Sequence, residues 1–224
     1  MSLTGIFLIC TIIPLLFGLW AQFKVKSTFK RYSQVPVTSG LTGAQAAEAV
    51  LRNSNVQVVG IRPVPGELSD HYDPRSKTLN LSEDVGQAAS VAALGVAAHE
   101  AGHAVQDARG YKPMQIRSTL VPAASIGSQL WIFPAIIGLI LGSTGLVNIG
   151  LVLFLAVVIF QLVTLPVEFD ASHRAIVALE GGGLLTDTEL SGARKVLQAA
   201  ALTYVAALAA SIGQLIYFFL ASRR

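Results

Sequence analysis

Four long apolar segments constrain the fold of this chain more than any other feature of its sequence. They comprise residues 3–20, 120–141, 145–166 and 200–220, and none of them contains Asp, Glu, Lys or Arg. Each is about 18 to 22 residues long, close to the ~20 helical residues that cross the hydrocarbon core of a bilayer. The composition agrees, because 53% of the residues are hydrophobic and only 13% are charged. The sequence therefore predicts a mainly α-helical integral membrane protein with about four transmembrane helices.

The first apolar segment is interpreted as a retained anchor. A cleaved signal peptide is the alternative, but no basic residue precedes the segment and no clear small-x-small cleavage site follows it. Lys and Arg are concentrated after it: residues 21–119 carry 11, residues 167–199 carry 3, and the tail carries Arg223 and Arg224. The positive-inside rule then places 21–119 and 167–199 in the cytoplasm and both termini outside the plasma membrane. The net charge of +3 reflects this asymmetry rather than nucleic-acid binding.

The sequence His99-Glu100-Ala101-Gly102-His103 has the pattern H-E-x-x-H and points to specific chemistry. Residues four apart lie on one face of a helix, so His99 and His103 can offer ring nitrogens to a single zinc ion. Glu100 would lie beside the open side of that ion, where its carboxylate can take a proton from zinc-bound water. Chance occurrence of a short pattern is the competing interpretation.

The residues around this motif favour a helix. The preceding run 91–98 consists of small, mostly helix-compatible residues. Ser82, followed by Glu83 and Asp84, has the character of an N-cap with acids in the first turn. We therefore predict that the motif helix extends over residues 83–107.

A catalytic zinc ion normally keeps three protein ligands and one open position, so His99 and His103 need a partner. The extended motif with a third histidine fails here, because Arg109 occupies that position. Cys10, the single cysteine, lies in the first apolar segment, so no thiolate is available near the motif. Asp107 is one turn beyond His103 and cannot readily fold back onto its own helix.

The remaining candidates for the third ligand follow the third apolar segment. Two predicted spans separate them from the motif, and an even number of crossings returns the chain to the same face of the membrane. Glu168 is favoured, with Asp170 and His173 as alternatives, because charged groups this close to a span are costly without a partner. The competing interpretation is a solvated helix start, in which Asp170 pairs with Arg174.

The motif 99–103, together with Val-Glu-Phe-Asp-Ala-Ser at 167–172 and Asn-Leu-Ser at 80–82, resembles the bacterial membrane neutral zinc metallopeptidases, the YugP-like family. The likeness covers nearly the whole chain. It implies a gluzincin-like membrane protease whose zinc ligands are His99, His103 and Glu168 and whose general base is Glu100.

The chain is more distantly similar to the HtpX-type membrane proteases. Those proteins commonly place an aspartate four residues after the ligand glutamate, where this chain has Ser172. The comparison implies that Asp170 takes the supporting role instead, by orienting a histidine ring through its free N–H.

The region between the first two spans contains further predicted elements. A capping box at Thr42 opens a helix through about residue 52, a strand follows over 56–61, and a hairpin over 71–81 turns at 73–76. The exposed edge of that hairpin could pair with an extended peptide.

Three further predictions concern the oxyanion stabiliser, His71 and the segment after the ligand motif. Tyr72 and His173 are candidates to stabilise the oxyanion that forms when water attacks the scissile carbonyl. His71 is interpreted as a surface histidine with a polar partner rather than a ligand. After the ligand motif, glycines at 181–183 are expected to stop a helix, and residues 186–189 to cap the next one.

The sequence thus predicts a zinc-dependent metalloendopeptidase that acts on membrane proteins or their cytoplasmic segments. A different enzyme class would cut inside the membrane, and a non-enzymatic alternative is a membrane scaffold or adaptor with a structural zinc site. No nucleic-acid partner is expected, and an oligomer or regulatory partner is left open.

The predicted organisation is an N-terminal transmembrane anchor (1–20), a cytoplasmic metalloprotease portion (21–119), a transmembrane hairpin (120–166), a second cytoplasmic segment with the third ligand (167–199) and a C-terminal transmembrane helix with its tail (200–224).

Overall fold

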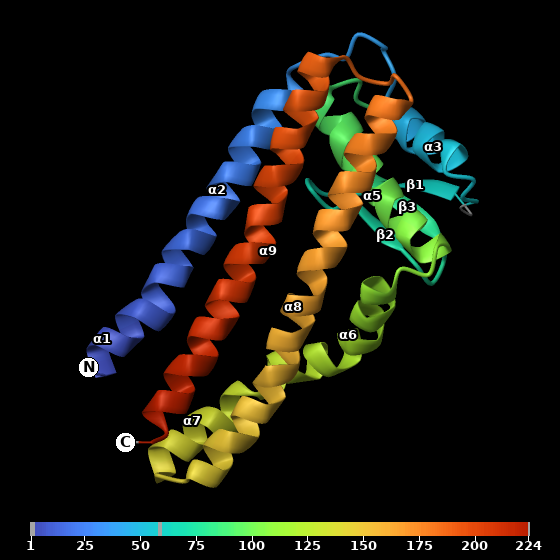
Figure 1. The fold of residues 1–224 in the computed structure, drawn as a ribbon. Coiled ribbons are helices and arrows are strands. Elements are labelled where there is room, and N and C mark those ends of the chain that lie inside the picture. Colours follow the sequence, from blue (N-terminus) through green and yellow to red (C-terminus); the bar gives the residue numbers. More distant parts are fainter. Residues whose placement is uncertain (1–2, 58–59, 224) are drawn as a thin grey trace. The chain divides into compact units, whose positions relative to one another are not determined.

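The computed structural model describes residues 3–57 and 60–223 (Figure 1). The chain divides into two compact units, and each draws on separate stretches of sequence. The membrane unit comprises residues 1–22, 115–166 and 202–224. The sheet unit, which contains the β-strands, comprises residues 23–114 and 167–201.

Four helical segments of the described chain are long and apolar enough to cross a membrane, in agreement with the four predicted spans. The protein is therefore a mainly helical membrane protein. All four helices are longer than the apolar segments predicted from the sequence. Hydropathy identifies only the residues that suit the lipid core, whereas helical hydrogen bonding continues into the polar residues that follow. The elements are α1 (Leu3–Phe7), the π-helix η1 (Leu8–Ile12) and α2 (Ile13–Ser33); α6 (Lys112–Leu130) and α7 (Ile132–Leu141); α8 (Thr144–Gly181); and α9 (Asp187–Ala221).

Small residues let helices of the membrane unit approach closely. A Cβ atom at Gly138 in α7 would lie 2.6 Å from the backbone nitrogen of Val147 in α8. A Cβ atom at Gly150 would lie 2.7 Å from the backbone oxygen of Trp131. The Trp131 ring in turn packs on Phe154, with ring centroids 4.4 Å apart. Close backbone packing of this kind replaces the hydrophobic driving force that helices lack in lipid.

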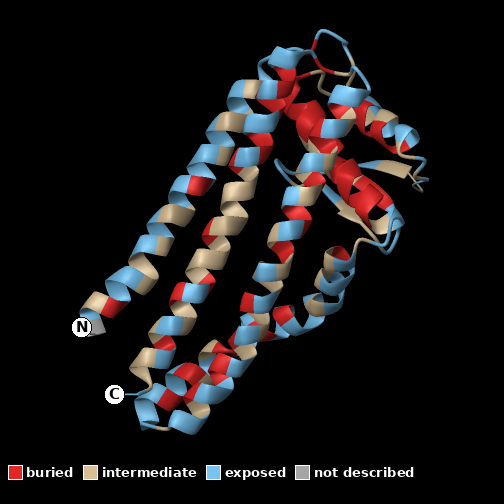
Figure 2. Cartoon of the chain, in the orientation of Figure 1, coloured by how far each residue is buried: buried red, intermediate tan, exposed pale blue. Residues whose placement is uncertain are grey.

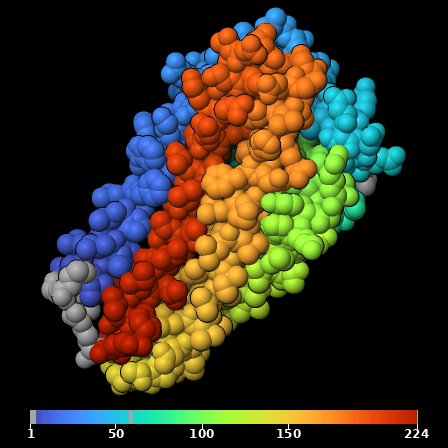
Figure 3. Space-filling model, in the orientation of Figure 1, coloured from blue at the N-terminus to red at the C-terminus, as the bar shows by residue number. Residues whose placement is uncertain are grey.

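Exposed residues recur along the helices of the membrane unit (Figure 2), and many of them are large and apolar. Figure 3 shows the chain as a space-filling surface coloured by residue number. A helix that is apolar on its exposed as well as its packed face is typical of a membrane span. The most exposed large apolar side chains of these helices are Ile140 at 77%, Phe23 at 72% and Val152 at 69%.

The sheet unit contains a three-stranded sheet, and its strands follow the order β1-β3-β2. The predicted hairpin is confirmed, since β2 and β3 are antiparallel with His71 opposite Asn80. Its turn is held by the Asp73 carboxylate, which accepts the N–H of Arg75 at 3.0 Å and the hydroxyl of Ser76 at 2.7 Å. The strands are β1 (Gly60–Val64), β2 (His71–Asp73) and β3 (Thr78–Ser82).

The predicted helix after Thr42 is confirmed as α3 (Gly43–Asn53), and its capping box is formed with Gln45. The strand predicted over 56–61 differs, because β1 begins only at Gly60. The residues just after α3 still close the helix: the Val56 N–H donates to the Leu51 oxygen at 2.9 Å. Residues 58 and 59 of that prediction lie outside the described residues.

The motif helix begins later than predicted. Residues 83–107 form two helices rather than one, α4 (Glu83–Gly86) and α5 (Val91–Ala108). The segment between them bonds to another part of the chain: the Val37 N–H donates to the Ala89 oxygen at 3.2 Å, and the Val91 N–H donates to the Val35 oxygen at 3.0 Å. The Ser90 hydroxyl, rather than that of Ser82, then caps the helix by accepting the Ala93 N–H at 3.3 Å.

Most residues of helix α5 are buried (Figure 2). It packs against α3 and against the sheet, and its alanines allow close contact on several sides. The core around it includes Val50, Leu51, Leu79, Leu81, Val85, Leu94 and Leu179.

The break between α8 and α9 follows the predicted helix signals. Helix α8 ends at Gly181, and Gly183 has a φ of +62°, a conformation that glycine adopts without strain. Thr186 caps α9 reciprocally with Glu189, whose carboxylate also accepts the backbone N–H of Thr38 at 2.6 Å. This carboxylate therefore ties the start of α9 to the segment before α3.

Candidate metal centre

Helix α5 lies close to α8 because residue 102 has no side chain. A Cβ atom at Gly102 would lie only 2.7 Å from the backbone oxygen of Ala171. Ala101 on α5 and Ala175 on α8 are completely buried. The glycine within the H-E-x-x-H motif thus permits the motif turns to approach the segment of α8 that follows Pro166.

Three potential metal ligands meet at this contact. His99 and His103 come from α5 and Glu168 comes from α8, and their ligand atoms all lie within 4.8 Å of one another. The Oε2 atom of Glu168 is 3.2 Å from Nε2 of His99 and 3.6 Å from Nε2 of His103. Donor atoms of a tetrahedral zinc ion with bonds of about 2.0–2.1 Å lie about 3.3 Å apart, so this spacing fits zinc.

The cluster is largely withdrawn from solvent. Glu168 is 2% exposed and His103 is 7% exposed, so water competes little for their polar atoms. Burial alone would lower the pKa of His103, but its contact with Glu168 and the negative charge of Glu100 raise that pKa above its ordinary value. The carboxylates of Glu168 and Glu100 thus favour positive charge at this position.

The second nitrogen of each histidine ring also has a partner. His99 Nδ1 is 3.1 Å from the Ser172 hydroxyl, and His103 Nδ1 is 2.9 Å from Oε1 of Gln106. Groups in these positions fix the ring orientation of metal-binding histidines. Both Nε2 atoms are consequently directed toward Glu168.

Asp170 lies one step further from the cluster than expected. We expected its carboxylate to orient a histidine ring directly, but it accepts a hydrogen bond from Nε2 of Gln106 at 2.8 Å and pairs with Arg174. It reaches His103 only through Gln106. The difference arises from helix geometry, because Ser172, four residues after Glu168, is the residue that lies one turn along the same face of α8.

Glu100 is held next to the cluster by the edge of the sheet. Its side chain is 8% exposed, and its Oε2 accepts the backbone N–H of Tyr72 in β2 at 3.0 Å. The Tyr72 hydroxyl donates to Asp107 at 2.7 Å, and its burial together with this carboxylate raises the pKa of Tyr72 well above its ordinary value. Tyr72 of β2 thus contacts α5 within the motif, at Glu100, and one turn after it, at Asp107, and the Tyr72 N–H already has a partner.

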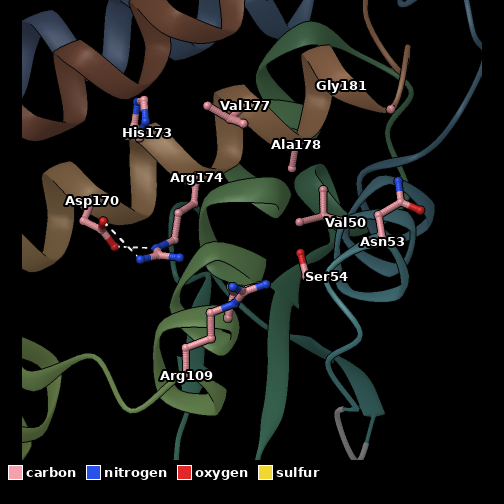
Figure 4. A pocket seen from close by; sticks show the side chains of 12 residues that line it. Val50, Asn53, Ser54, Arg109, Asp170, His173, Arg174, Val177, Ala178 and Gly181 are labelled. Atoms are coloured by element: carbon pink, nitrogen blue, oxygen red, sulfur yellow. Dashed lines mark hydrogen bonds and ion pairs between the residues drawn. The ribbon is translucent and has the colours of Figure 1, made fainter.

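His173 does not lie with the three potential ligands. It lines a cavity of about 760 Å³ that also includes Asp170, Arg174 and Arg109 (Figure 4). In Figure 4 its ring points away from the ion pair of Asp170 and Arg174. His71, as expected, is an exposed histidine with a polar partner, since its Nδ1 is 2.8 Å from the Ser69 oxygen.

Gln106 and Ser172 are the contacting residues that sequence reasoning missed. Gln106 follows His103 by three residues, a spacing that brings side chains together on a helix. Ser172 occupies the position where the distantly similar proteases commonly have an aspartate. Both spacings can be read from the sequence, but the contacts of Gln106 with Asp170 and of Ser172 with His99 depend on how α5 packs against α8.

An H-E-x-x-H helix that faces a glutamate on a membrane-spanning helix defines a class of membrane proteins with a candidate zinc centre. The chain belongs to the family described as "Putative neutral zinc metallopeptidase", whose model matches residues 7–223. It is 43% identical over 213 residues to the "Putative membrane protease YugP" of Bacillus subtilis (strain 168), and the match covers 95% of each chain. No solved structure gives a significant match.

Proposed function

We propose that this protein is a zinc-dependent metalloendopeptidase, with His99, His103 and Glu168 as the zinc ligands and Glu100 as the general base. The observation that carries the proposal is the position of the Glu168 carboxylate, 3.2 and 3.6 Å from the two Nε2 atoms of the motif. Two histidines and a glutamate are a known ligand set of catalytic zinc in peptidases. Membership in a family of zinc metallopeptidases supports the same proposal.

Glu100 supplies the proton chemistry in this proposal. A bound zinc ion would polarise the scissile carbonyl and acidify the attacking water. Glu100 accepts the proton of that water and passes it to the leaving amine. The Tyr72 N–H, at 3.0 Å from Oε2 of Glu100, fixes the direction of the carboxylate while its other oxygen stays available for the proton.

Tyr72 and His173 are the proposed stabilisers of the developing oxyanion. Tyr72 has the closer connection to the centre, because its backbone contacts Glu100 and its hydroxyl contacts α5. Loss of one oxyanion donor costs about 10²–10³ in kcat. We expect Tyr72→Phe to lower kcat at unchanged zinc content, and a matching loss in His173→Gln with none in Tyr72→Phe would transfer the role to His173.

The proposed location is the plasma membrane, with several spans and with the candidate site on the cytoplasmic side. The distribution of Lys and Arg supports this orientation, because residues 21–119 and 167–199 together carry most of the basic residues. Helix α5 is not among the four described helices that could span a membrane. Both observations favour substrates that are membrane proteins or their cytoplasmic segments.

Wild type and Glu100→Gln, purified in the same detergent, test the proposed function. We expect about one zinc ion per chain in both by elemental analysis, and cleavage of an unfolded or membrane-protein substrate by the wild type alone. His99→Ala is the control that should lose the zinc. Equal zinc content without cleavage by either protein would instead support the scaffold with a structural site.

The position of the cut tests the substrate class. Mass spectrometry of the products should place it in a segment outside the membrane spans of the substrate. A cut within a span would replace the proposed reaction by intramembrane proteolysis.

A further inference from the structure

Gln106 is a buried polar residue, and both the oxygen and the nitrogen of its side-chain amide have hydrogen-bond partners. It is 0% exposed and follows His103 by one turn on α5. Its Oε1 is 2.9 Å from Nδ1 of His103. Its Nε2 donates to the backbone oxygen of Val167 and to Oδ2 of Asp170, each at 2.8 Å.

The partner on α8 determines how the amide of Gln106 is oriented. The Val167 oxygen can only accept a hydrogen bond, so the NH₂ group of Gln106 must face it. The Oε1 atom then faces His103 and can only accept, which requires a proton on Nδ1 of that ring. In the neutral ring Nε2 is consequently the unprotonated nitrogen, and this is the atom that lies 3.6 Å from Glu168.

The same amide also holds the segment of α8 that carries Glu168. Its two acceptors, Val167 and Asp170, flank Glu168 along the chain. The contact between Gly102 and Ala171 lies at the same interface, where a Cβ would be 2.7 Å from the Ala171 oxygen. One side chain therefore constrains both a histidine ring on α5 and the glutamate helix opposite it.

We propose that Gln106 is a positioning residue that assembles the metal centre before the ion binds. It fixes the tautomer of His103 and holds Glu168 at the distance at which both can bind one ion. The inference rests on the proposed zinc site. Glutamine suits this role because it has an acceptor and donors in one neutral group, whereas a carboxylate only accepts and an ammonium only donates.

Three substitutions separate the two ends of the amide. Gln106→Met keeps the length of the side chain and removes both functions. Gln106→Glu keeps the acceptor for His103 but loses the donors to α8, and Gln106→Lys keeps a donor but loses the acceptor. Gln198→Met, at an exposed position on α9, is the matched control for the change of residue type.

Zinc affinity of the full chain in detergent, measured by chelator competition, is the first readout. We expect Gln106→Met to weaken zinc binding by about 10–100-fold, as for other groups that orient metal-binding histidines. Gln106→Glu and Gln106→Lys should fall between Met and wild type, and Gln198→Met should match wild type. Wild-type affinity in Gln106→Met would overturn the proposal.

The Co²⁺-substituted protein supplies a readout that packing alone does not change. The Nδ1–H of His103 should give an exchangeable, hyperfine-shifted proton signal, and this proton should exchange with solvent faster in Gln106→Met and Gln106→Lys than in wild type and Gln106→Glu, because only the latter two keep an acceptor for it. An exchange rate in Gln106→Met equal to that of wild type would show that Gln106 does not hold the His103 ring. Both readouts are independent of peptide cleavage, so a wild type that binds zinc without cleaving peptides would refute the proposed function and leave this test intact.

Discussion

The carboxylate of Glu168 contacts both motif histidines, so its loss should affect metal binding more than any change around it. We expect Glu168→Gln to abolish tight zinc binding, because the amide that replaces the carboxylate carries no charge. Asp170→Asn, which acts only through Gln106, should cost about 10-fold to 100-fold in affinity. Chelator competition in detergent measures both, and a larger loss in Asp170→Asn would assign the third ligand to Asp170.

Ser172 permits a test in the opposite direction. Its hydroxyl is 3.1 Å from Nδ1 of His99, where a carboxylate would raise the basicity of the ring more strongly. We expect Ser172→Ala to weaken zinc binding by about 10-fold or more, and Ser172→Asp to equal or exceed wild type. Wild-type affinity in Ser172→Ala would show that the hydroxyl does not orient His99.

Single residues also show how far the sequence could define the site. His99 and His103 follow from helical spacing, and Glu168 follows from ligand chemistry together with the even number of crossings. Gln106 and Ser172 could not be assigned, because their partners lie on another helix and depend on the rotation of α8 against α5. The expected contact of Asp170 with a histidine ring was wrong for the same reason.

At the level of elements, the contact between α5 and α8 depends on Gly102. An alanine there gains helix propensity but places a Cβ 2.7 Å from the Ala171 oxygen. Overpacking of this kind costs about 1–3 kcal/mol, so Gly102→Ala should unfold at a lower temperature and bind zinc more weakly.

Gly86→Ala is the matched control for this prediction. Its Cβ would meet only the Leu81 Cβ, at an ordinary 3.5 Å. Thermal unfolding of the two variants in one detergent should therefore separate them. Equal stability of Gly102→Ala and wild type would show that α5 and α8 can move apart without cost.

The long helices were predictable from the sequence, whereas the residues at which elements begin and end were not. The four spans and the helix after Thr42 follow from apolar length and from a capping box, which are local properties. The start of α5 depends instead on hydrogen bonds between 87–91 and the distant segment 35–37, which local sequence does not encode. Ser82 and Ser90 are both plausible caps, and only the second one accepts a helical N–H in the structure.

At the level of the whole molecule, the sheet unit is interrupted in sequence by a membrane hairpin. It combines residues 23–114 with 167–201, whereas residues 115–166 belong to the membrane unit. The His99 and Glu168 side chains that meet in the cluster are separated by 69 positions. Both halves of the centre must therefore lie on the same face of the membrane, and this links the metal site directly to the topology.

A reporter fused after Arg224 tests that topology. The four spans place this end outside the cell if the N-terminus is outside, so alkaline phosphatase should be active there and green fluorescent protein dark. The same reporters inserted in the exposed Asp73–Ser76 turn should give the opposite result, because residues 21–119 carry 11 Lys and Arg. Fluorescence at both sites would require an even number of crossings between them instead of three. Residues 99–103 and Glu168 would then face opposite sides unless two crossings still separate them, which confines the error to α9.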